Sequence, residues 1–178
     1  SVFCEHVRLG LKYVPSCFEN RPEHLYPLLI TSTGRSGTKY TASVLQTLGY
    51  SITHDDALVI GSDGAVSWPL AVNTLRSYPT WVKHPGNARF TTLIHQVRDP
   101  LKSIPSRAAH IIAIMTPYVK AHTPEMQRMT DAFRNNSMAV SLLHYVTWHK
   151  LIELQNPDMR FRIEALDTTT MKQILRTA

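Results

Sequence analysis

The sequence is poor in cysteine, in charge and in long apolar runs, and each shortage argues against a class of protein. Its two cysteines form no CxxC pair and have no histidines at zinc-ligand spacing, which argues against a structural zinc site. No apolar run approaches the ~20 residues that a membrane-spanning helix needs. Charged residues make up 18% of the chain and hydrophobic residues 43%, which is the balance of a folded globular protein.

The charge that is present is mainly positive. The formal net charge is +6 with nine further histidines, so the surface field favours anionic partners. Nucleic acid, a membrane surface, a nucleotide and a sulfated sugar all fit that description. Charge alone does not separate them, and the chemistry of the site has to decide.

The order of secondary structure predicts an α/β fold. Short apolar runs that end in turn residues predict strands over residues 27–32, 50–54, 89–97 and 159–163. Apolar residues at helical spacing predict helices over 38–48, 67–76, 137–154 and 168–175, with a loop over 55–66. Because strands alternate with helices, we expect a three-layer sandwich with a central parallel sheet and right-handed crossovers.

A further helix is expected directly after the 89–97 strand. Asp99 is suited to cap it, and Pro100 is suited to its first position. Pro105 lies only five residues further on. It is expected to interrupt this helix early or to kink it, because proline lacks the backbone N–H that an interior position uses.

No repeat, low-complexity tract or linker divides the chain. We therefore expect a single domain over residues 1–178, with residues 1–26 as an N-terminal extension. The chain starts at Ser1 rather than at a methionine and shows no apolar segment of a signal peptide. A fragment is the natural interpretation, which leaves open a C-terminal truncation and the loss of a targeting or anchoring segment.

The clearest motif is a glycine-containing loop between the first predicted strand and the first predicted helix. This 33–38 loop consists of Thr33, Gly34, Arg35, Ser36, Gly37 and Thr38. Glycines let the backbone curl so that successive N–H groups point at an anion, and the helix N-terminus adds partial positive charge. Arg35 supplies a full charge, and the hydroxyl groups supply donors. A tight turn without a ligand is the plainer alternative.

The loop does not match the Walker A motif of ATPases and GTPases. That motif needs a lysine directly after its second glycine and then serine or threonine. Here Thr38 follows Gly37, Lys39 comes one place late, and Tyr40 stands where the magnesium-binding hydroxyl belongs. A conventional nucleoside triphosphatase is therefore disfavoured.

A second motif lies at the end of the 89–97 strand. Arg98 follows this strand, and Ser106 comes eight residues later in the next helix. Open α/β sheets bind ligands at the carboxyl ends of their strands, so both side chains can reach one phosphate there. The plainer alternative is an arginine paired with a nearby carboxylate.

Together the two motifs resemble the sulfotransferase family that uses 3′-phosphoadenosine 5′-phosphosulfate (PAPS), over roughly residues 27–165. In that family a loop of the kind seen at 34–38 binds the 5′-phosphosulfate. An arginine at a strand end and a serine eight residues on, here Arg98 and Ser106, bind the 3′-phosphate. The resemblance implies that Arg35 stabilises charge on the leaving group. Lys39 stands where many members have a small hydroxyl residue, so it either contacts phosphate or points to solvent.

The resemblance also requires a base for the acceptor hydroxyl, and His54 and Asp55 are the candidates. The stretch from His54 to Trp68 is similar to one in which Gly-His-Glu is followed by Asp-Gly-x-x-Ser-Trp. In this chain Thr53 replaces the glycine and Asp55 replaces the glutamate. Of the other histidines, His95 is expected to be a satisfied core residue, and His149 is expected near the surface.

The resulting hypothesis is an enzyme that transfers a sulfuryl group from PAPS, as co-substrate, to a hydroxyl or amine acceptor without a metal. Two alternatives stay open: a non-catalytic domain that retains the nucleotide site, and an ATP-dependent kinase on a similar fold. The acceptor class stays open among carbohydrate, protein and small molecule, and nucleic acid is not expected as a partner. Oligomeric state and compartment, cytoplasm or Golgi lumen, are also left open.

Overall fold

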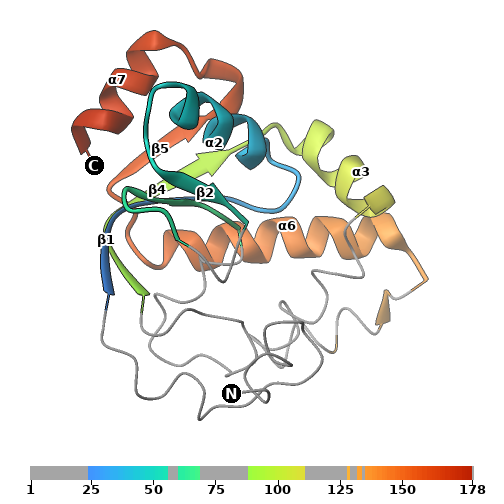
Figure 1. Cartoon of the computed structure of the whole chain (residues 1–178). Coiled ribbons are helices and arrows are strands. Elements are labelled where there is room, and N and C mark those ends of the chain that lie inside the picture. Colours follow the sequence, from blue (N-terminus) through green and yellow to red (C-terminus); the bar gives the residue numbers. More distant parts are fainter. Residues whose placement is uncertain are drawn as a thin grey trace, which may run out of the picture.

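The computed structural model describes residues 24–55, 60–68, 88–110, 128, 132–133 and 135–177. Within these ranges five strands form one parallel sheet in the order β2-β3-β1-β4-β5 (Figure 1). The strands are β1 (His24–Thr31), β2 (Ile52–His54), β3 (Gly64–Val66), β4 (Ala88–Val97) and β5 (Met159–Arg162). The helices are α2 (Thr38–Thr47), α3 (Pro100–His110), α6 (Ser137–Glu153) and α7 (Thr168–Thr177), with a 3₁₀ turn η3 (Ile163–Ala165). The predicted α/β fold with a parallel sheet is confirmed.

Strand β1 lies at the centre of the sheet and pairs with β3 on one side and β4 on the other. A strand with neighbours on both edges and helices over its faces has no solvent-facing side, which explains its continuous apolar run. Leu29 and Ile30 are accordingly fully buried. The central position also brings the end of β1 beside the end of β4, where the two sequence motifs begin.

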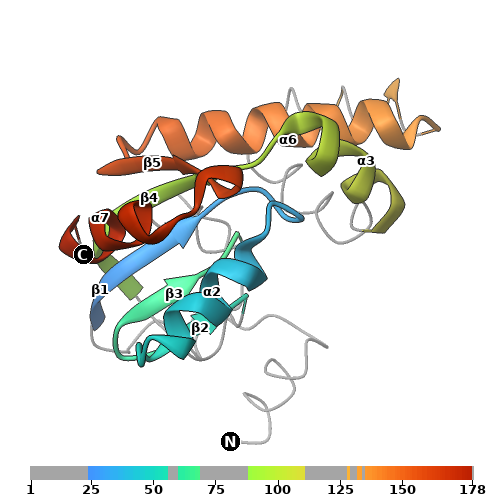
Figure 2. The same cartoon turned by 90° about the horizontal axis from the view of Figure 1, so that it is seen from above.

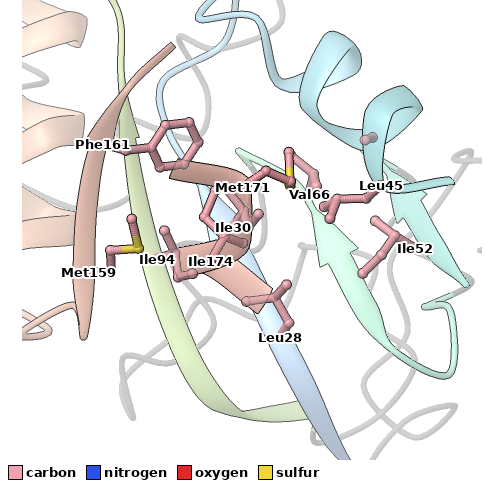
Figure 3. Close-up of a cluster of buried hydrophobic side chains, with 11 residues drawn as sticks. Leu28, Ile30, Leu45, Ile52, Val66, Ile94, Met159, Phe161, Met171 and Ile174 are labelled. Atoms are coloured by element: carbon pink, nitrogen blue, oxygen red, sulfur yellow. The ribbon is translucent and has the colours of Figure 1, made fainter. Parts of the chain in front are cut away.

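The two faces of the sheet are packed differently. Helices α2 and α7 cover one face, and α6 crosses the other (Figures 1 and 2). The main core lies under α2 and α7, where Leu45 and Ile174 pack on Ile30 and Ile94 (Figure 3). Side chains alternate along a strand, so β4 turns His95 towards the opposite face, that of α6.

Strand β3 corrects the sequence prediction, which placed a loop over residues 55–66. Gly-Ala-Val is too short to produce a recognisable apolar run, and glycine usually marks a turn. Gly64 is required because its φ is +124° and a Cβ there would lie 1.8 Å from the carbonyl oxygen of Leu28. Strand β1 also begins at His24, three residues before the predicted start, so the predicted extension overlaps it. The predicted helix over 67–76 lies outside the described residues beyond Trp68, as do both cysteines.

Helix α3 begins at Pro100 as predicted but continues through Pro105 to His110. The expected early interruption is therefore wrong. Proline at this position removes only the N–H that would bond the carbonyl of Leu101, and the helix retains its contact with α6, where the Ser141 hydroxyl donates to the carbonyl of Ile104 at 2.8 Å.

The two histidine predictions had opposite outcomes. His95 is buried and bonded to Glu153 and His149, as expected for a satisfied core residue. His149 was expected near the surface and is instead half-buried against His95 and Tyr145. Helix α6 buries more than one of its faces, so the polar neighbours of His149 in sequence did not indicate exposure.

Candidate functional site

The 33–38 loop joins β1 to α2 at the carboxyl edge of the sheet. Its curl depends on two left-handed residues, Gly37 at φ +84° and Arg35 at φ +68°. The hydroxyls of Thr33 and Ser36 lie 2.6 Å apart and are buried, so these two side chains close the loop from inside. Arg35 is the one exposed residue of the loop.

Gln96 supports the loop from below, a role that the sequence analysis missed. This fully buried side chain donates to the carbonyl of Ser36 at 2.7 Å and accepts from the Thr41 hydroxyl at 2.6 Å. It thereby ties the end of β4 to both the loop and the first turns of α2. A glutamine inside an otherwise apolar strand was the available sequence signal, because buried polar groups are retained where they are hydrogen-bonded.

The second motif meets the first at Arg35. The Arg98 guanidinium donates to the carbonyl oxygen of Arg35 at 2.9 Å, and Arg35 Nε donates to the Ser106 hydroxyl at 3.0 Å. Ser103 lies one turn before Ser106, and its hydroxyl is 3.5 Å from that of Ser36. Residues more than sixty positions apart therefore converge on one loop.

The candidate base residues lie beside the start of α2. His54 Nε2 is 3.0 Å from the Thr38 hydroxyl and 3.3 Å from Asp55 Oδ2. Asp55 is held in a left-handed conformation with φ +49°, and its Oδ1 accepts the backbone N–H of Trp68 at 3.2 Å. Burial raises the pKa of the Asp55 carboxyl, while His54 and the Trp68 N–H oppose that rise. A carboxylate with a raised pKa is a better proton acceptor near neutral pH.

These residues surround a cavity of about 260 Å³. Its lining consists of Gly34, Arg35, Gly37, Thr38, Lys39, His54, Asp55, Trp68 and Arg98. Three of these side chains are cations and one is a carboxylate, so the cavity attracts anions. Thr33, Ser36 and Ser106 do not line it. The first two are buried inside the loop, and the Ser106 hydroxyl is engaged by Arg35.

The described part of the chain contains no group of three or more histidine, cysteine, aspartate or glutamate side chains that could hold a metal ion. The same residues include no helix long and apolar enough to span a membrane. Around the cavity, Arg35, Lys39 and Arg98 can compensate the charge of a bound anion.

Comparisons of the chain with protein-family models, with curated proteins and with solved structures found no match.

Proposed function

We propose that this chain is a sulfotransferase-type domain, a three-layer α/β sandwich whose strand–loop–helix binds the phosphosulfate of PAPS. The observation that carries the proposal is the meeting of the two motifs at Arg35, where Arg98 and Ser106 both contact it. Arginine side chains, hydroxyl groups and the N–H groups of helix N-termini are common hydrogen-bond donors to phosphate. The 33–38 loop and Lys39 would hold the 5′ side, and Arg98 and Ser106 would hold the 3′-phosphate.

The reaction is transfer of a sulfuryl group to a hydroxyl or amine acceptor. The acceptor atom forms a bond to sulfur, and the bond between sulfur and the bridging phosphate oxygen breaks. The acceptor proton passes to Asp55 or His54, and the electron pair leaves on the 5′-phosphate of adenosine 3′,5′-bisphosphate. Arg35 stabilises the charge that develops on this leaving group. The raised pKa of Asp55 favours it as the base, with His54 as its hydrogen-bonding neighbour.

Calorimetry with adenosine 3′,5′-bisphosphate tests the nucleotide assignment directly. Arg98→Ala and Arg35→Ala should each weaken binding by about tenfold or more, because each removes charge-assisted hydrogen bonds. Arg176→Ala on α7 is a matched control that removes one exposed positive charge far from the loop in sequence. This variant should bind adenosine 3′,5′-bisphosphate as tightly as the wild-type protein does. If the wild-type protein gives no heat and no thermal shift at saturating nucleotide, the proposal is refuted.

Turnover is tested separately, with radiolabelled donor and pools of carbohydrate, peptide and small-molecule acceptors. Label transferred to any pool identifies the acceptor class. Nucleotide binding without transfer to any pool supports the non-catalytic alternative, to which the replacement of glutamate by Asp55 lends weight. Binding of ATP that requires magnesium would instead favour a kinase.

A further inference from the structure

One peptide group at the end of β4 is held from both sides by side chains of distant elements. The Tyr145 hydroxyl of α6 donates to the carbonyl oxygen of Arg98 at 2.7 Å. The N–H of Asp99, which belongs to the same peptide group, donates to Glu164 Oε1 of η3 at 2.9 Å. Both polar atoms of the Arg98–Asp99 peptide are thus fixed by side chains, 47 and 65 residues away.

The orientation of this peptide decides where two proposed ligand-binding groups point. A peptide plane held at both ends restricts ψ of Arg98 and φ of Asp99, the two rotations that connect β4 to α3. Arg98 carries the guanidinium that reaches the loop, and α3 carries Ser106. Asp99 Oδ1 also accepts the N–H of Leu101 at 2.9 Å, so the start of α3 is set at the same point.

Tyr145 is itself held in place by its own helix. Its ring packs edge-on against the ring of His149 one turn later, with centroids 4.3 Å apart. His149 Nδ1 lies 2.6 Å from His95 Nε2 on β4, three residues before Arg98. The phenol ring of Tyr145 therefore packs on His149, which is itself bonded to β4. A hydrogen-bond donor on a supported ring retains its direction with little loss of entropy.

We propose that Tyr145 and Glu164 are positioning residues that aim Arg98 and Ser106 at the 3′-phosphate of the nucleotide. This inference rests on the proposed nucleotide site and adds two residues that belong to neither sequence motif. Each side chain bonds one polar atom of the Arg98–Asp99 peptide, so both act through this peptide rather than by touching the ligand.

The test compares two nucleotides that differ only in the 3′-phosphate, adenosine 3′,5′-bisphosphate and adenosine 5′-phosphate. Tyr145→Phe retains the ring and removes the donor. It should lower the affinity for adenosine 3′,5′-bisphosphate by about tenfold, which corresponds to roughly one hydrogen bond. The affinity for adenosine 5′-phosphate should not change. Glu164→Ala should do the same. Glu164→Gln should restore affinity, because its amide oxygen still accepts the Asp99 N–H.

Two controls separate positioning from a general structural effect. Tyr40→Phe removes a hydroxyl from an exposed tyrosine of α2 and should alter neither affinity. In an Arg98→Ala/Ser106→Ala background, Tyr145→Phe should have no further effect on bisphosphate binding, because both groups that it positions are gone.

The outcomes are distinct. If Tyr145→Phe lowers the affinities for both nucleotides equally, or lowers neither, the positioning role is wrong, whereas the proposed nucleotide site is not contradicted. An additive loss in the Arg98→Ala/Ser106→Ala background overturns it as well. If the wild-type protein binds neither nucleotide, the proposed function fails and the positioning role fails with it.

Discussion

His95 Nε2 lies 2.6 Å from His149 Nδ1 in the interface between β4 and α6. At that distance one ring must donate an N–H and the other must accept it, so the pair cannot hold a further proton there without repulsion. Burial, then His95 and Arg107, lower the pKa of His149 to about 3. Burial also lowers the pKa of His95, although Glu153 opposes that shift. Both rings are therefore neutral at neutral pH.

This pair predicts loss of stability in mild acid. Unfolded histidine titrates near a pKa of about 6.5, whereas folded His149 stays neutral down to much lower pH, so only the unfolded state gains a proton between these values. The free energy of unfolding should fall between pH 6.5 and pH 5 by about 2 kcal/mol through His149. Urea denaturation at pH 7.5 and pH 5 measures it, and His149→Gln should reduce the difference. Equal pH dependence in the variant would contradict the prediction.

Gly64 predicts a sharp contrast with a second glycine. A Cβ at Gly64 would collide with backbone atoms of Leu28, whereas Gly49 has a similarly positive φ of +91° and nothing within 4 Å. Gly64→Ala should lower the free energy of unfolding by roughly 3 kcal/mol or more, because β1 and β3 must separate. Gly49→Ala should cost about 1–2 kcal/mol from backbone strain alone. Similar losses in the two variants would show that the close approach to Leu28 is unimportant.

The same residue shows where sequence reasoning stops. Strand β1, α2 and the 33–38 loop could be predicted because their patterns are local: an apolar run, helical spacing and glycines between them. Gly64 looked like a turn residue in the sequence. Glycine is required there because the backbone of Leu28 lies close by, and that contact exists only once β1 and β3 have paired. The burial of His149 was missed for a similar reason, since it depends on which faces of α6 are covered.

The candidate site divides in the same way. Arg35, Arg98 and Ser106 were chosen from the sequence because they follow the ends of strands, where open α/β sheets bind ligands, and their role in binding stays a prediction. Gln96, Tyr145 and Glu164 bind neighbours far away in sequence, and no spacing rule connects them to the residues that they support. Only the fold brings these partners together.

Gln96→Met tests the support beneath the loop. Methionine is similar in length but cannot bond, so the Ser36 carbonyl and the Thr41 hydroxyl lose their shared partner. Each buried polar group without a partner costs about 1–3 kcal/mol, and the loss of stability should lie in that range or above it. Urea denaturation measures the change. In a Thr41→Val background the penalty should shrink, since one orphaned group is already absent; an unchanged penalty would argue against the Thr41 bond.

Arg107 predicts a substitution that stabilises the protein. Its side chain is 1% exposed, and no described residue accepts a hydrogen bond from its guanidinium. Burial lowers its pKa to about 10, which still leaves it charged at pH 7. Because an uncompensated buried charge is costly, Arg107→Met should raise the free energy of unfolding by about 1–3 kcal/mol. Arg176→Met, at an exposed position, should change it by less than about 0.5 kcal/mol. Strong destabilisation by Arg107→Met would instead reveal a paired charge.

Asp55→Asn separates the two candidate bases. If Asp55 accepts the acceptor's proton, asparagine should reduce transfer by about a hundredfold or more while retaining affinity for adenosine 3′,5′-bisphosphate. Transfer requires the carboxylate form, so wild-type activity should rise with pH through a limb above the ordinary aspartate pKa of 3.8, since burial raises the Asp55 pKa. The pH profile of Asp55→Asn should lack that limb. His54→Gln should retain it if His54 only hydrogen-bonds Thr38 and Asp55, whereas loss of the limb in His54→Gln alone would assign the base to His54.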